Sequence, residues 1–132
     1  MNILIVDDSP IIRTMLRRCV GLSGLQVKSV REAPDGEAAW DAFQEEPAEI
    51  IMCDIHMPRL DGIGFIQRLA QNDYLPRVKI IIISSDRSRE RRLELESLGI
   101  DSYLTKPFTP EGVRQSLQGA TIRIQRRQET NP

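Results

Sequence analysis

Five polar side chains stand at the ends of apolar runs, and together they would suit the transfer of a phosphoryl group. A carboxylate can bind a hard cation or act as a nucleophile, while a lysine and a hydroxyl can hold phosphoryl oxygens. These side chains are Asp7 and Asp8 after residues 3–6, Asp54 after 50–53, Ser84 after 78–83, and Lys106 close behind 100–104.

The three carboxylates would repel one another if they shared one pocket. Two such charges about 4 Å apart cost roughly 4 kcal/mol at an effective dielectric near 20, so cations must offset them. Magnesium (Mg2+) fits because it takes oxygen ligands and usually keeps several of its waters. Mn2+ shares this preference for oxygen ligands. Lys106 would add a second, fixed positive charge.

The apolar runs predict strands of a parallel sheet, because near-continuous apolar stretches suit strands that are buried on both faces. The carboxyl ends of such strands share one edge, where ligands bind. Apolar residues at helical spacing predict a helix after each strand, and therefore an α/β fold with helices on both faces. The predicted strands are 3–6, 26–30, 50–53, 78–83 and 100–104, and the predicted helices carry 11–20, 38–43, 63–69, 87–98 and 113–124.

The composition is that of an ordinary globular protein. The 132 residues suit one domain, and a formal net charge of −1 gives no electrostatic basis for direct nucleic-acid binding. No apolar run approaches the roughly 20 residues that span a bilayer, so we expect no membrane insertion. Cys19 and Cys53 lie in apolar patterns, which favours reduced thiols and a cytoplasmic location. We place the domain at residues 1–124 and expect a polar C-terminal tail, residues 125–132, to fray.

Four motifs, each at the end of a predicted strand, resemble those of one family. They are VDDS at residues 6–9, DIHMP at 54–58 with DG at 61–62, ISS at 83–85, and YLTKPF at 103–108. With these motifs the chain resembles the receiver domain of a two-component response regulator, of the CheY-like superfamily. The resemblance implies a flavodoxin-like, doubly wound (βα)5 sandwich with a parallel five-stranded sheet of order 2-1-3-4-5. That order would make the first and third strands neighbours.

The resemblance also implies a role for each site residue. Asp54 would be the phosphoacceptor, supplied by a cognate histidine kinase or a phosphotransfer protein. The metal ligands would be Asp7, Asp8, Asp54 and the backbone carbonyl of His56. The phosphate-binding and switch residues would be Ser84, Tyr103 and Lys106, and the bond before Pro107 would be cis.

Three of these residues keep a second interpretation. Ser84 is preferred over Ser85 because it continues the apolar run directly, although either hydroxyl could serve. Tyr103 could simply be a half-buried aromatic with a hydrated hydroxyl. His56 could tune dephosphorylation, or it could face solvent from a loop.

The resulting hypothesis is a signalling switch, which catalyses only its own phosphorylation and dephosphorylation. Its output would be a protein partner at the face of the fourth helix, fifth strand and fifth helix, roughly residues 87–121, with the chain a monomer or a phosphorylation-dependent dimer. The VDDSP start, residues 6–10, followed by Arg13, is more typical of single-domain regulators of the chemotaxis and pilus-motility type.

Two alternatives stay open. One is the receiver fragment of a longer transcriptional or enzymatic regulator. The other is a Mg2+-dependent phosphatase of the haloacid dehalogenase type, although His56 stands where that class has its acidic residue.

Overall fold

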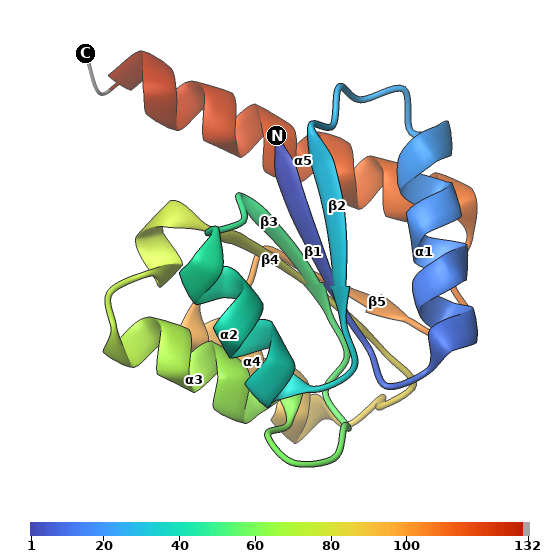
Figure 1. Ribbon diagram of the computed structural model, residues 1–132, viewed down its shortest axis with the longest axis vertical. Coiled ribbons are helices and arrows are strands. Elements are labelled where there is room, and N and C mark those ends of the chain that lie inside the picture. Colours follow the sequence, from blue (N-terminus) through green and yellow to red (C-terminus); the bar gives the residue numbers. More distant parts are fainter. Residues whose placement is uncertain (131–132) are drawn as a thin grey trace.

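The computed structural model describes the backbone of residues 1–130 and the side chains of residues 1–126. One parallel sheet runs through it in the order β2-β1-β3-β4-β5, so the predicted α/β class and strand order are confirmed (Figure 1). The strands are β1 (Asn2–Val6), β2 (Ser29–Ala33), β3 (Ile50–Cys53), β4 (Lys79–Ser84) and β5 (Ser102–Thr105). The helices are α1 (Pro10–Leu22), α2 (Gly36–Glu45), α3 (Gly62–Gln71), α4 (Arg89–Leu98) and α5 (Pro110–Thr130), with a short 3-10 turn η1 (Leu75–Arg77).

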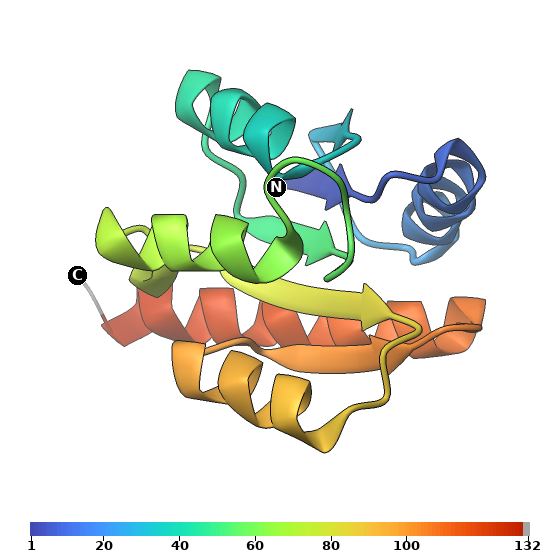
Figure 2. The ribbon, with the colours of Figure 1, turned by 90° about the horizontal axis from the view of Figure 1, so that it is seen from below.

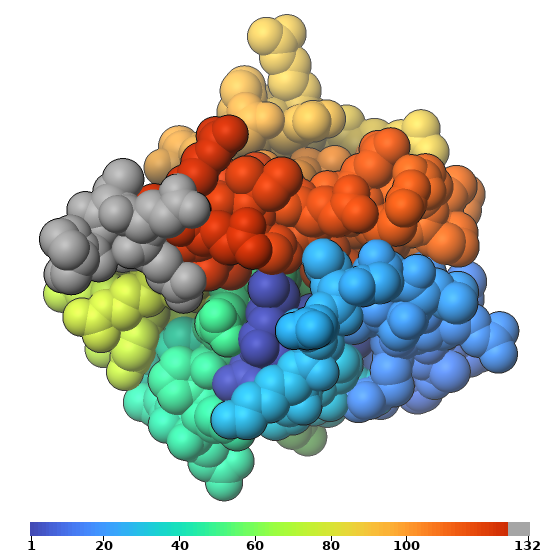
Figure 3. Space-filling view, turned by 90° about the horizontal axis from the view of Figure 1, so that it is seen from above, coloured from blue at the N-terminus to red at the C-terminus, as the bar shows by residue number. Residues whose placement is uncertain are grey.

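The helices form two layers, one on each face of the sheet (Figures 1 and 2). Side chains alternate along each strand, so Ile3 and Ile5 of β1 pack with α1 and α5, while Leu4 and Val6 pack with α2, α3 and α4. Helices α1 and α5 lie side by side on their face (Figure 3). The central strands are buried from both sides, which explains their near-continuous apolar runs.

Short polar caps start the helices that leave the carboxyl edge of the sheet. The side chains of Ser9, Asp35 and Asp61 accept hydrogen bonds from the backbone amides of Ile12, Ala38 and Gly64, at the starts of α1, α2 and α3. At the other end of α4, Gly99 adopts a left-handed conformation with φ of 101°. The caps at Ser9 and Asp61 fix the starts of the helices that follow the loops of Asp7 and Asp54.

Some strand boundaries predicted from the sequence are wrong. The second strand begins at Ser29 rather than residue 26, and it includes Arg31 and Glu32. This strand lies at the edge of the sheet, so one side of it needs no neighbour and tolerates charged residues. The fifth strand begins at Ser102 instead of residue 100, because the carboxylate of Asp101 accepts a hydrogen bond from the amide of Ile80 at 2.7 Å.

The last helix is longer than its apolar pattern. It runs from Pro110 to Thr130, so its predicted end near residue 124 is too early and residues 125–130 are helical. Its own hydrogen bonds can extend a helix past the last apolar residue. Residues 131–132 lie outside the described residues, and where the domain ends stays a prediction. Within the described part of the chain, no helix has both the length and the apolar character to cross a bilayer.

Candidate functional site

The order of the strands brings three carboxylates together. Strands β1 and β3 are direct neighbours, and the amide of Asp54 donates to the carbonyl of Val6 at 2.9 Å. One oxygen each from Asp7, Asp8 and Asp54 lies within 4.8 Å of the others. Asp7 and Asp54 are buried, at 1 % and 8 % exposure, whereas Asp8 is exposed. The predicted acidic pocket therefore exists at the carboxyl edge of the sheet.

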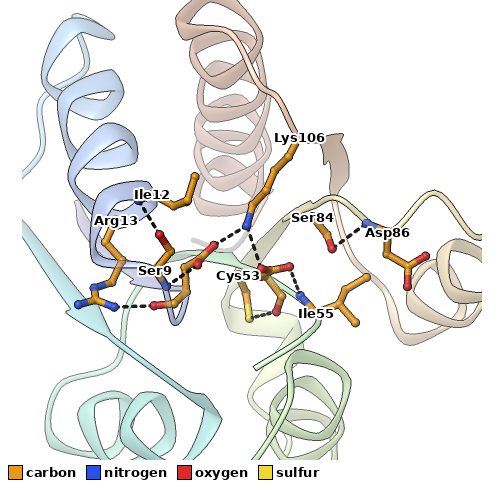
Figure 4. Close-up of polar contacts among 10 residues, drawn as sticks. Ser9, Ile12, Arg13, Cys53, Ile55, Ser84, Asp86 and Lys106 are labelled. Atoms are coloured by element: carbon orange, nitrogen blue, oxygen red, sulfur yellow. Dashed lines mark hydrogen bonds and ion pairs between the residues drawn. The ribbon is translucent and has the colours of Figure 1, made fainter. Parts of the chain in front are cut away.

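Lys106 binds both buried carboxylates. Its Nζ lies 2.8 Å from Oδ2 of Asp7 and 2.9 Å from Oδ2 of Asp54 (Figure 4). Burial would lower the pKa of Lys106, but the hydrogen bonds and charges of the two carboxylates outweigh it and raise the pKa above its ordinary value. Burial raises the pKa of Asp7, and the hydrogen bond from Lys106 opposes that rise only in part. Three carboxylates thus lie in the pocket, and Lys106 forms ion pairs with two of them.

The remaining carboxylate oxygens meet backbone amides. Oδ1 of Asp7 accepts from the amide of Ser9 at 2.9 Å, and Oδ1 of Asp54 accepts from the amide of Ile55 at 2.7 Å. Each buried carboxylate is therefore oriented at both oxygens. The carboxylate of Asp8 has no hydrogen bond to any group in the described part of the chain, so it is free to take a ligand.

The donor set fits a hard divalent cation. Its side-chain donors are carboxylate oxygens, and Mg2+ takes such ligands while leaving part of its coordination to water. The exposure of Asp8 gives an ion and its waters a route to the pocket. The thiol of Cys53, the residue before Asp54, is fully buried, and burial raises the pKa of that thiol well above its usual range. A thiol held protonated is a poor ligand, so the oxygen set decides which metal fits.

The loop after β3 packs closely on the start of α3. A Cβ on Gly62 would lie 2.1 Å from the backbone oxygen of Asp54, and the amide of Gly62 donates to the carbonyl of Ile55 at 2.8 Å. Only glycine fits there. Gly62 of the DG pair thus packs directly against Asp54, the residue that follows β3.

The hydroxyl and the aromatic residue meet at a residue that the sequence analysis missed, Asp86. Ser84 is fully buried while Ser85 is exposed, and Oγ of Ser84 accepts from the amide of Asp86 at 3.2 Å (Figure 4). The hydroxyl of Tyr103 donates to the carbonyl of Asp86. Position was the signal available: an aspartate two residues after the strand-end serine can fold back on the loop.

The side chain of Asp86 also contacts His56, two residues after Asp54. His56 Nε2 lies 2.7 Å from Oδ2 of Asp86, and this hydrogen bond lowers the pKa of Asp86. His56 thus has a partner, although more than half of its side chain is exposed. The loop that carries the candidate phosphoacceptor is thereby joined to the loop that follows Ser84.

Two further features frame the pocket. The peptide bond between Lys106 and Pro107 is cis, the configuration that the resemblance implies, and the amide of Lys106 donates to the carbonyl of Ser84 at 2.9 Å. On the other side, Nη1 of Arg13 donates to the backbone oxygen of Asp7 at 2.7 Å. No role at this site was predicted for Arg13, because its contact with Asp7 is to a backbone atom.

Comparison with known proteins places the chain in a family. Residues 3–118 match the family model described as "Response regulator receiver domain". The chain is 31 % identical over 118 residues to the "Probable chemotaxis protein CheY" of Rhizobium etli, covering 89 % of this chain and 90 % of that protein. It is 32 % identical over 130 residues to the "Probable transcriptional regulator ycf27" of Porphyridium aerugineum, covering 98 % of this chain but only 52 % of that protein.

Solved structures of similar proteins agree with this family assignment. The chemotaxis protein CheY4 of Vibrio cholerae superposes with a TM-score of 0.75 at 30 % identity, covering 89 % of this chain and 95 % of that one. The chain thus spans nearly all of its chemotaxis relatives and about half of the transcriptional relative. None of these matches favours the phosphatase alternative. The chain belongs to the response regulator receiver domains of two-component systems.

Proposed function

We propose that this receiver domain accepts a phosphoryl group on Asp54 in a Mg2+-dependent reaction. The observation that carries the proposal is the bridge of Lys106 to Asp7 and Asp54, within a cluster of three carboxylates at the ends of β1 and β3. The phosphodonor would be the phosphohistidine of a kinase or a phosphotransfer protein, as the family membership supports.

Transfer of the phosphoryl group requires little covalent chemistry from the protein. An ionised oxygen of Asp54 attacks the phosphorus, the new O–P bond forms as the P–N bond breaks, and the electron pair of that bond stays on the departing imidazole. The amide of Ile55 keeps Asp54 oriented through Oδ1. The ammonium of Lys106 lies next to Oδ2 and can stabilise the negative charge that develops on the phosphoryl oxygens.

The metal ligands would be Asp7, Asp8, Asp54 and the backbone carbonyl of His56, with Mg2+ preferred and Mn2+ as an alternative. When bound, the ion would neutralise phosphoryl oxygens and offset the repulsion among the carboxylates. Asp7 and Asp54 would hold their places through backbone amides, while Asp8 would supply the exposed ligand.

The switch would run through Ser84. A phosphoryl group on Asp54 offers strong acceptors for the Ser84 hydroxyl, which now accepts from the amide of Asp86. Moving Ser84 would disturb the loop before α4 and the hydroxyl of Tyr103, which donates to that same loop. The change would therefore reach the surface of α4, β5 and α5.

We infer that a protein partner reads that surface, and that the chain is a monomer or a phosphorylation-dependent dimer acting in the cytoplasm. In this role it is a signalling switch and turns over no separate substrate. The chemotaxis relatives, which the chain nearly spans, support this role. The transcriptional relatives keep open the alternative of a receiver within a longer regulator.

Intact-mass measurement after incubation with acetyl phosphate tests the proposal. With Mg2+ we expect wild type and Asp41→Asn, an exposed aspartate of α2, to gain the mass of one phosphoryl group. Asp54→Asn should gain none, and EDTA should abolish the gain in wild type. An unmodified wild type under all conditions, or a phosphorylated Asp54→Asn, would overturn the proposal.

A further inference from the structure

Asp8 differs from the other two carboxylates in what holds it in place. Asp7 and Asp54 are each fixed by Lys106 and by a backbone amide. Among the described residues, no group donates to the carboxylate of Asp8, yet its oxygen lies in the same 4.8 Å cluster. The direction of its side chain is therefore set by the backbone that carries it.

The peptide between Asp7 and Asp8 is held at its oxygen by a side chain from α1. Nη1 of Arg13 donates to the carbonyl of Asp7 at 2.7 Å (Figure 4). Because a peptide unit is planar, a fixed carbonyl also fixes the direction in which the next residue leaves. The amide of Asp7 is fixed as well, by donation to the carbonyl of Ala33 at 3.1 Å.

Arg13 is itself held by the edge strand. Its Nε donates to Glu32 of β2 at 3.1 Å, and its side chain is only 17 % exposed. Arg17, one turn further along α1, shares Glu32 at 2.8 Å but is 47 % exposed, and its other contact is the carbonyl of Val30. The two arginines thus have the same charge and the same carboxylate partner, and of the pair Arg13 is the one bonded to the Asp7 carbonyl.

We propose that Arg13 is a positioning residue of the metal site, which aims the carboxylate of Asp8 by clamping the Asp7–Asp8 peptide to Glu32 on β2. This inference rests on the proposed function in one respect, namely that Asp8 is a Mg2+ ligand. Groups that orient metal ligands typically change metal affinity by 10–100-fold when removed.

A purely electrostatic role and a positioning role of Arg13 predict opposite changes in Mg2+ affinity when the side chain is replaced. A guanidinium near a cation site repels the cation, so removing its charge alone should tighten Mg2+ binding. Removing a clamp should weaken binding, because Asp8 would then have to be ordered by the ion itself. The direction of the change therefore separates the two roles.

Mg2+ titration by isothermal calorimetry on Arg13→Gln and Arg17→Gln, with wild type alongside, tests the proposal. We expect Arg13→Gln to weaken Mg2+ binding by about tenfold and Arg17→Gln to change it less than about twofold. Glu32→Gln, which keeps Arg13 but loosens its anchor, should give an intermediate loss and serves as the second variant if Arg13→Gln folds poorly. Circular dichroism of each variant checks the fold.

The outcomes are distinguishable. Unchanged or tighter binding by Arg13→Gln, or an equal loss in Arg17→Gln, would overturn the positioning role while leaving the proposed function intact. A wild type that binds no Mg2+ would instead remove the proposed function, and the inference with it.

Discussion

At the scale of single residues, the pocket contains clustered carboxylates whose negative charge Lys106 balances only in part. Asp7 and Asp54 are buried side by side, and both rely on Nζ of Lys106. A buried carboxylate that loses its cationic partner keeps its desolvation cost without compensation. The metal-free protein should therefore depend on Lys106 for stability as well as for chemistry.

Replacing Lys106 by Met should lower the free energy of unfolding by about 2 kcal/mol without Mg2+, below the roughly 3–5 kcal/mol of a fully buried pair because the lysine is 18 % exposed. Lys79→Met is the matched control. Lys79 is 3.9 Å from Asp101, which also keeps Arg123 at 3.0 Å, so its loss should cost less than about 1 kcal/mol. Urea unfolding of both variants measures the difference, and equal losses would contradict this picture of the pocket.

Asp7 should leave a signature in the pH dependence of stability. Its pKa is raised by burial above the ordinary 3.8, so between 3.8 and the raised value the folded state holds a proton that the unfolded state has released. Stability should therefore fall as pH rises through that window. In metal-free urea unfolding, Asp7→Asn should lack this component, so its stability relative to wild type should rise across the window and then level off. A constant difference would show that Asp7 does not titrate abnormally.

At the scale of elements, the site depends on how closely loops approach one another. The start of α3 touches the backbone of Asp54 through Gly62, and the loop before α4 is tied to His56 and Tyr103 through Asp86. These contacts come from separate β-α units. Each loop is therefore placed by its neighbours as much as by its own strand and helix.

Gly62→Ala tests the tightest of these contacts. Its Cβ would lie 2.1 Å from the Asp54 oxygen and 2.9 Å from Cα of Ile55, so the variant should lose about 1–3 kcal/mol and bind Mg2+ more weakly. Gly21→Ala is the control, because its Cβ meets nothing within 4 Å at the end of α1, and it should gain about 0.5–1 kcal/mol. Chemical denaturation compares them, and a harmless Gly62→Ala would show that the loop can move away.

At the scale of the whole molecule, repulsion among the carboxylates of the pocket affects the stability of the entire domain, because they are attached to the sheet. The carboxylates follow β1 and β3, the central strands that both hydrophobic layers cover. A ligand that relieves their repulsion in the folded state alone must stabilise the entire domain.

Mg2+ should therefore raise the free energy of unfolding, by about 1.4 kcal/mol for each tenfold increase in concentration above its dissociation constant. Asp8→Asn should shift this rise to higher Mg2+ concentrations, since it removes an exposed ligand without disturbing the core. Asp41→Asn should behave as wild type. Thermal or urea unfolding over a Mg2+ series measures the concentration at which the rise begins, and the same onset in all three proteins would argue against a site at Asp8.

Local sequence patterns were enough to predict most of the elements and the chemistry they carry. Apolar runs followed by Asp7, Asp54 and Ser84 are such a pattern, so these strand ends could be identified without coordinates. The resemblance supplied the strand order, which the structure confirms. Periodicity located the central strands well because burial on both faces leaves an unbroken apolar signal.

The contacts between groups far apart in the sequence could not be predicted from local patterns. The contacts of Arg13 with the Asp7 carbonyl and of Tyr103 with the Asp86 carbonyl involve backbone oxygens, which leave no mark in a side-chain pattern. The bounds of the edge strand β2 and the last turns of α5 were also predicted wrongly, because neither depends on apolar side chains for its hydrogen bonds. Sequence encodes what each residue can do, and the packing of separate β-α units fixes what each residue touches.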